Sequence, residues 1–315
     1  MIPILIVVAI LIFTLMYFVP GDPVQIALGD HATETQIEAY RERLGLNDPY
    51  MVRLFDYLKG VFLHLDFGES YIYGTDVGAE LLSRLPATLI LALSCVLFSV
   101  IFGVPIGIFS AIKANKPADR ISMVLTQFFN SMPSFWLALM LVILFALKLG
   151  WLPSSGIGSW KHFILPVLAN SLGSLAGIAR QTRSSMLEVI RADYVVTARS
   201  KGLSEYKVIT AHALPNALIP IITICGSRFG HMLGGTTVIE SIFSIPGIGS
   251  YMINGINSRD YPVVQGCIVY IAFMFSIMML VTDLVYAFVD PRIKAQYVKG
   301  GKKKKSSKKT AEAAA

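Results

Sequence analysis

Ser227 and His231 are a pair whose residue types and spacing could do chemistry, because they stand four apart in an apolar stretch. Residues four apart share one face of a helix, so a serine nucleophile and a histidine base could meet there. No oxyanion donor is identifiable beside them, and side chains that share a face can equally line a cavity. We interpret the pair as part of a polar route and keep an intramembrane serine protease as an alternative.

Other catalytic signatures are missing from the sequence. It contains no G-x-x-x-x-G-K-[ST] loop for phosphates, no H-E-x-x-H and no paired-cysteine motif. The cysteines Cys95, Cys225 and Cys267 all fall in apolar stretches, where cysteine behaves as a small hydrophobic residue. We therefore expect no enzyme activity, no metal and no cofactor in this chain.

The composition indicates a membrane protein. Of 315 residues, 54% are hydrophobic and only 15% are charged, whereas a soluble domain has about a quarter charged residues. Helices that cross a bilayer need about 17–25 apolar residues, and six stretches approach that length. They are 2–19, 87–112, 121–147, 164–179, 216–239 and 263–289. The expected fold is an all-α membrane protein with six transmembrane helices, the first of them kept as an anchor because it has no signal-cleavage site.

The distribution of Lys and Arg predicts the orientation. Basic residues gather in 113–120, in 180–212 and in 292–309, and such segments stay in the cytoplasm. Both termini are then cytoplasmic, and the long loop 20–85, which is rich in acidic residues, is extracytoplasmic. The net charge of +7 thus reflects topology rather than nucleic-acid binding. We divide the chain into 1–85 (first helix and outer loop), 86–290 (a five-helix core containing the loop 180–215) and 291–315 (a basic, disordered cytoplasmic tail).

Polar stripes on three apolar stretches predict a route through the membrane. In the fifth stretch Gly226, Gly230 and Gly234 recur every four residues, which favours close helix packing. Gly173 and Gly177 form a similar pair in the fourth. Arg228 is costly at mid-span unless it faces a cavity or a partner; the alternative is an ion pair with Asp283 inside the bundle. The predicted route comprises Gln127, Asn130, Ser131, Asn170, Ser227, Arg228 and His231.

The loop between the fourth and fifth stretches predicts two short helices with a bend. Asp193 and Ser204 are residue types that cap helix N-termini, and Gly202 can adopt the left-handed conformation that ends a helix. Pro215 then suits the first turn of the next span. A helical hairpin of this kind on the cytoplasmic side has the shape of a docking element.

Several segments of the sequence resemble one family. "TARSKGL" and "HALPNALIP" in this loop are similar to the cytoplasmic loop of binding-protein-dependent ABC importer permeases of the dipeptide, oligopeptide and nickel branch. "PGDP", "LGLNDP", "DFGES", "VIESIFSIPGIG", "NSRDYP" and "DLVYAFVDPRI" resemble the same branch in the same order. The loop departs from the wider superfamily pattern, because Val196, Thr197 and His212 stand where that pattern has Glu, Ala and Ile.

The resemblance implies that this loop carries the helix that couples the permease to ATP hydrolysis. The implied ATPase contacts are Thr197, Ala198, Arg199, Ser200, Lys201, Gly202, Leu203, Ser204, Glu205 and Tyr206. ATP itself would be bound by two separate ATPase subunits. The other implied partners are a second homologous permease, an extracytoplasmic substrate-binding protein and the lipid bilayer, with no nucleic acid. The location would be the cytoplasmic (inner) membrane of a bacterium or archaeon.

The implied cargo is a di- or oligopeptide, with nickel, a metal chelate or glutathione as alternatives within the same class. An ion-coupled secondary transporter stays open as a different class, although no internal repeat of the kind that such transporters carry is evident. The segment "ESIFSIPGIG" is expected to re-enter the outer leaflet, since its Pro and Gly break a helix. Glu240, Pro246 and Gly247 would then lie at the outer mouth, where Glu240 would help to receive the substrate.

Overall fold

The computed structural model describes residues 2–29 and 32–289, and most of these residues are helical. Their only strand-like contact is an isolated pairing of Glu69 with Asp76. The predicted all-α fold is therefore confirmed. The tail assigned to 291–315 lies outside the described residues.

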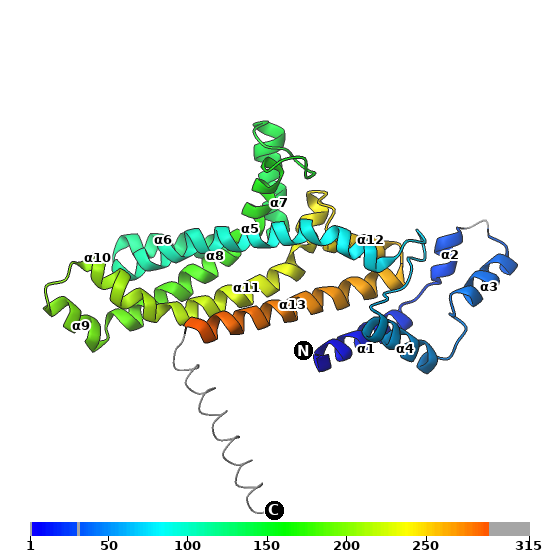
Figure 1. Ribbon diagram of the computed structural model, residues 1–315. Helices are drawn as coiled ribbons and strands as arrows, with labels where there is room; N and C mark the ends of the chain where they lie inside the picture. Colours follow the sequence, from blue (N-terminus) through cyan, green and yellow to red (C-terminus); the bar gives the residue numbers. More distant parts are fainter. Residues whose placement is uncertain (1, 30–31, 290–315) are drawn as a thin grey trace, which may run out of the picture.

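The long helices form one elongated bundle (Figure 1). Its members are α5 (Val77–Ile112), α6 (Pro117–Asn130), α8 (Lys161–Ile190), α11 (Leu214–Ile242) and α13 (Tyr261–Val289). Four helices in the described part are long and apolar enough to cross a membrane, and a bent pair raises this to five. The first helix, α1 (Ile2–Phe18), is apolar but has only 17 residues, and it packs beside α13.

Glycines without a predicted role allow α5 to pack closely against α8. A Cβ atom on Gly107 would lie 2.5 Å from the Ala179 carbonyl oxygen and 2.5 Å from Cβ of Thr182. At Gly103 it would lie 3.0 Å from the Leu175 carbonyl oxygen. Because backbone occupies this space, only glycine permits this approach of the two helices.

Replacing Gly107 with alanine is expected to destabilise the chain by about 1–3 kcal/mol, the usual cost of forcing a methyl group into a filled interface. The thermal unfolding midpoint in detergent measures this effect. Gly173→Ala is the matched control, because a Cβ atom there has no neighbour within 4 Å among the described residues, so the packing role predicted for Gly173 is wrong. Equal midpoints for the two variants would contradict the packing argument.

Two of the three glycines predicted to pack the fifth span do so, against α13. A Cβ atom at Gly226 would meet Cγ2 of Thr282 at 2.1 Å, and one at Gly230 would meet the Phe275 ring at 2.6 Å. Within the described part of the chain, Gly234 has no neighbour within 4 Å of a Cβ position, so its predicted packing role is wrong.

The third predicted span is sharply bent. Helix α6 ends at Asn130, and α7 (Ser134–Leu141) with the π-helical η2 (Val142–Lys148) continues at 95° to it. Pro133 stands at the break, and a proline disfavours helical conformation in the residue before it. Figure 1 shows α7 standing out from the bundle.

The outer region contains short helices: α2 (Pro23–Leu28), α3 (Glu34–Arg43), α4 (Tyr50–Lys59) and the π-helical η1 (Gly60–His64). A capping box begins α3, because the Thr33 hydroxyl accepts from the Gln36 amide and the Gln36 side chain accepts from the Thr33 amide. Gly45 follows the end of α3 with φ +63°, the left-handed conformation that commonly ends a helix. Helix α12 (Ile248–Asn257) follows α11 after a break at 243–247, in the segment expected to be broken by its proline and glycine.

Candidate functional site: the loop between α8 and α11 and the helices it joins

The loop between α8 and α11 contains α9 (Asp193–Ser200), α10 (Glu205–Lys207) and the π-helical η3 (Val208–Ala213). Gly202 has φ +77°, the left-handed conformation predicted for the bend. The predicted cap at Asp193 is wrong: Ala192 holds the cap position and Asp193 is the first helical residue. Ser204 does occupy the cap position of α10, although its side chain makes no capping hydrogen bond.

The sequence suggested that a new helix starts at Pro215. In the structure the second helix of the loop instead continues past Pro215. Helix α10, η3 and α11 follow one another without a break, and residues 205–230 form one continuous helical span. Pro215 lacks an amide hydrogen and would leave one helical hydrogen bond unmade. It lies in the first turn of α11, just after the π-helical residues, where the altered hydrogen-bond pattern accommodates it. A displacement of α10 is thus passed directly into α11.

An ion pair joins the two loop helices across the Gly202 bend. Nη2 of Arg199 lies 2.8 Å from Oε1 of Glu205, and Nε lies 3.1 Å from Oε2. Nη1 of Arg199 also donates to the Ile190 carbonyl at 3.3 Å, near the end of α8. The hydrogen bonds to Glu205 raise the pKa of the Arg199 guanidinium. The pair therefore braces the bend at Gly202 by joining α9 to α10.

A buried apolar cluster fastens the loop helices to the bundle. Val195 and Ala198 of α9 pack with Val208 and Ile209 of η3 and with Met186 of α8. Ala198 is only 5% exposed, so it supports the loop from inside instead of forming its outer surface.

The exposed tip of the loop carries aromatic and apolar side chains. Tyr206 is 80% exposed, as expected for a contact residue, and Lys201 and Gly202 are exposed beside it. Tyr194 and Val196 are also exposed, although they were not among the predicted contacts. Their apolar character within a polar loop is the sequence signal that could have found them. The tip therefore offers a surface suited to a protein partner.

The residues predicted to line a route lie in different surroundings in the structure. The Arg180 guanidinium donates to the Gln127 side chain, next to a cavity of about 450 Å³ between α6 and α8. Asn170 of α8 lies 3.8 Å from the Cys95 sulfur of α5. Asn130 and Ser227 are half-buried, and the Ser131 hydroxyl donates to the Gln127 carbonyl. The side chain of His231 lies outside what the structure describes, and the route through these seven residues stays a prediction.

Arg228 is half-buried and points at α8. A Cβ atom on Gly177 would lie 2.5 Å from Nη2 of Arg228, so this glycine provides space for the guanidinium. The alternative ion pair with Asp283 is wrong, because no such pair occurs among the described residues, which include both side chains. The mid-span arginine therefore has no carboxylate partner within the described part of the chain.

The outer-mouth residues lie at the joint between α11 and α12. Glu240 is fully buried, and its carboxylate accepts from the Thr88 hydroxyl at 2.8 Å and the Ser250 amide at 3.1 Å. Gly247 is buried against the same carboxylate, whereas Pro246 is exposed. In this arrangement Glu240 ties α5, α11 and α12 together, and its contact with substrate stays a prediction.

Comparisons with known proteins identify the family to which this chain belongs. Residues 103–295 match the family described as "Binding-protein-dependent transport system inner membrane component", and residues 1–92 match its N-terminal membrane component. The chain belongs to this family of transport permeases. It is a multi-pass inner-membrane subunit. This assignment excludes the alternative of an intramembrane serine protease.

Relatives of the permease match it over nearly its whole length. The glutathione transport system permease protein GsiC of Salmonella choleraesuis (strain SC-B67) is 39% identical over 93% of this chain and 96% of its own. A protein of Brucella abortus (strain 2308), named for a peptide transport system permease, is 40% identical over 93% of this chain and 96% of its own. A chain of the inward-facing MetNI methionine ABC transporter has the same fold, with TM-score 0.58 and 16% identity over 67% of this chain and 96% of that chain.

A buried ion pair that the sequence did not reveal holds together the helix ends next to the loop. Asp119 of α6, only 3% exposed, accepts from Nε and Nη2 of Arg183 on α8, both at 2.7 Å. The Ser110 hydroxyl of α5 and the Asn115 amide at 2.9 Å complete its partners. Asp119 is the single acidic residue in a basic segment, and that contrast was the available signal. This network ties α5 and α6 to the part of α8 that leads into the loop.

Proposed function

We propose that the permease is one of two membrane subunits of an ATP-driven importer that carries di- or oligopeptides received from an extracytoplasmic binding protein. The main support is the whole-length similarity to proteins named for peptide and glutathione transport systems. Glutathione is the second candidate cargo, since the 39% identical relatives carry that name. Nickel and metal chelates are the remaining alternatives.

The geometry of the loop supports a lever mechanism. Two separate ATPase subunits would bind ATP, and one of them would bind the exposed tip of the loop around Tyr206. Because the Arg199–Glu205 pair and the apolar cluster stiffen the loop, a push at the tip would move the ends of α8 and α11 together as a rigid body. The two permease subunits would then open and close the route between them.

Reconstitution of the purified components into vesicles tests this function. The permease, its partner permease, the ATPases and the binding protein should together take up a labelled dipeptide when ATP is supplied on the ATPase side. Leaving out the ATPases should abolish uptake. Uptake by the permease alone under an ion gradient would instead establish a secondary transporter. Competition between unlabelled dipeptide and glutathione ranks the two candidate cargoes.

We also propose that the six predicted spans all cross the membrane, with both termini in the cytoplasm. Helix α1 and the bent pair α6–α7 would be the two spans that length alone does not establish. A cysteine introduced at the exposed Thr35 of α3 should react with an impermeant reagent from outside intact cells. A cysteine at the exposed Ser204 should react only after the membrane is opened, and the reverse pattern would exclude this orientation.

A further inference from the structure

A small cavity lies in the outer region of the permease, where α1 ends and α13 begins. Its volume is about 260 Å³, and Tyr17, Asp22, Arg41, Arg53 and Tyr261 are among the residues that line it. The Tyr261 hydroxyl donates to the Gly21 carbonyl at 3.3 Å and so fixes one wall. The "PGDP" segment thus meets α3, α4 and the first turn of α13 at this cavity.

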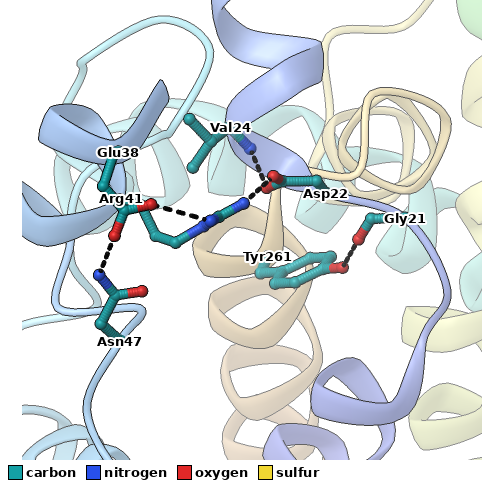
Figure 2. A network of polar contacts seen from close by, with 7 residues as sticks. All are labelled: Gly21, Asp22, Val24, Glu38, Arg41, Asn47 and Tyr261. Carbon is teal, nitrogen blue, oxygen red and sulfur yellow. Dashed lines mark hydrogen bonds and ion pairs between the residues drawn. The ribbon is translucent and has the colours of Figure 1, made fainter. Parts of the chain in front are cut away.

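One of the arginines at this cavity, Arg41, is neutralised by carboxylates of the protein itself. Figure 2 shows Arg41 between Asp22 and Glu38, and both carboxylates form ion pairs with it. Asp22 also accepts from the Val24 amide at 2.9 Å, and Glu38 accepts from Asn47 at 2.8 Å. The hydrogen bond to Asp22 raises the pKa of Arg41. Arg41 therefore shapes the wall of the cavity and leaves its charge neutralised.

Two further arginines lack a carboxylate partner among the described residues: Arg53 lines the cavity, and Arg259 lies beside Gly21, which lines it. Arg53 lies over the Tyr17 ring, 5.6 Å from its centroid, and its Nη1 reaches the Leu46 carbonyl only at 3.5 Å. Arg259 is exposed and adopts φ +52°, and its guanidinium occupies the space where a side chain on Gly21 would begin. The cavity and its rim consequently carry unneutralised positive charge.

The surface beside the cavity is apolar and exposed. Phe18 at the end of α1 is 75% exposed, and Met51 and Phe55 on one face of α4 are 72% and 67% exposed. Helix α4 is held against α1 by Phe13 and Tyr57, whose rings stack at 5.3 Å between centroids. A helix with an exposed apolar face beside a membrane span is suited to the interface between headgroups and acyl chains.

We propose that this cavity binds the phosphate-bearing headgroup of an anionic phospholipid in the outer leaflet. Arg53 and Arg259 would contact the phosphate through their guanidinium groups, which match phosphate geometry. The acyl chains would lie along the exposed apolar faces of α1 and α4. The lipid is favoured over a soluble anion because the positive cavity adjoins this apolar surface and the two together match an amphipathic ligand.

Native mass spectrometry of the full permease, after titration with phosphatidylglycerol or phosphatidylcholine, tests the proposal. The wild type should bind phosphatidylglycerol more tightly than phosphatidylcholine. Arg53→Gln and Arg259→Gln should each weaken phosphatidylglycerol binding about fivefold, the effect of one basic residue near a charged membrane surface. Arg53→Lys should keep part of the affinity, because the charge stays while the guanidinium geometry is lost, and this partial retention separates loss of charge from misfolding.

Arg43→Ala is the matched control, because it removes the same charge from α3 at an exposed position away from this cavity. It should leave the affinity for phosphatidylglycerol unchanged. Equal binding of the two lipids by the wild type, or an unchanged affinity in the Arg53→Gln/Arg259→Gln double variant, would overturn the proposal. Displacement of the bound lipid by millimolar inorganic phosphate alone would overturn the proposal as well. So would the finding that the binding protein, and not a lipid, occupies the cavity.

Discussion

Replacing Gly202 with valine is expected to abolish transport while the membrane helices stay folded. Gly202 has φ +77°, and left-handed backbone costs a residue with a Cβ atom about 1–2 kcal/mol, most for a β-branched side chain. A Cβ atom at this position has no neighbour within 4 Å in the part of the chain that the structure describes, so the strain is in the backbone and not in packing. Relief of that strain would rotate α10 away from α9 and separate Arg199 from Glu205.

Gly202→Asn is the matched control, because asparagine tolerates the left-handed conformation. Uptake of labelled peptide by the reconstituted transporter measures the effect, and ATP hydrolysis by the ATPases without the permeases should be the same for all samples. The asparagine variant should keep most of the transport rate. Normal transport by the valine variant would show that the loop does not work as a braced lever.

Sequence alone places this bend correctly, because only a few residue types accept positive φ and the glycine stands between two helix-forming segments. It cannot reveal the Arg199–Glu205 brace, since these residues are six apart and meet only when the bend is formed. The same limit explains the continuous second helix. Pro215 indicates a helix start, and the π-helical residues before it are not visible in the hydrophobic pattern.

Tertiary contacts also determine which polar residues meet. Gln127, Asn170 and Arg228 all stand on predicted spans, yet each faces a different partner on α8 or α5. Helical spacing predicts which residues share a face of one helix but not how the helices rotate against each other. Most of the apolar spans could be predicted from hydrophobicity, whereas the 95° bend at Pro133 depends on a local break that composition does not reveal.

Replacing Glu240 with alanine is expected to destabilise the permease by about 2–6 kcal/mol and to remove transport with it. The carboxylate is fully buried and accepts from the Thr88 hydroxyl and the Ser250 amide. Each buried donor left without an acceptor costs about 1–3 kcal/mol. Thr88 also accepts from the Ile248 amide at 2.9 Å, so the loss would loosen the joint between α11 and α12 from both sides.

Glu240→Gln and Thr88→Val together separate a structural role from contact with substrate. The glutamine keeps the size of the side chain and loses one acceptor oxygen, while the valine removes the main partner of Glu240 on α5. If Glu240 serves as a tie between helices, both variants should lower the thermal unfolding midpoint, and uptake should fall in proportion to the midpoint. A Glu240→Gln variant with a wild-type midpoint and a strongly reduced uptake would instead assign Glu240 to the substrate, because the fold would then be intact and only recognition lost.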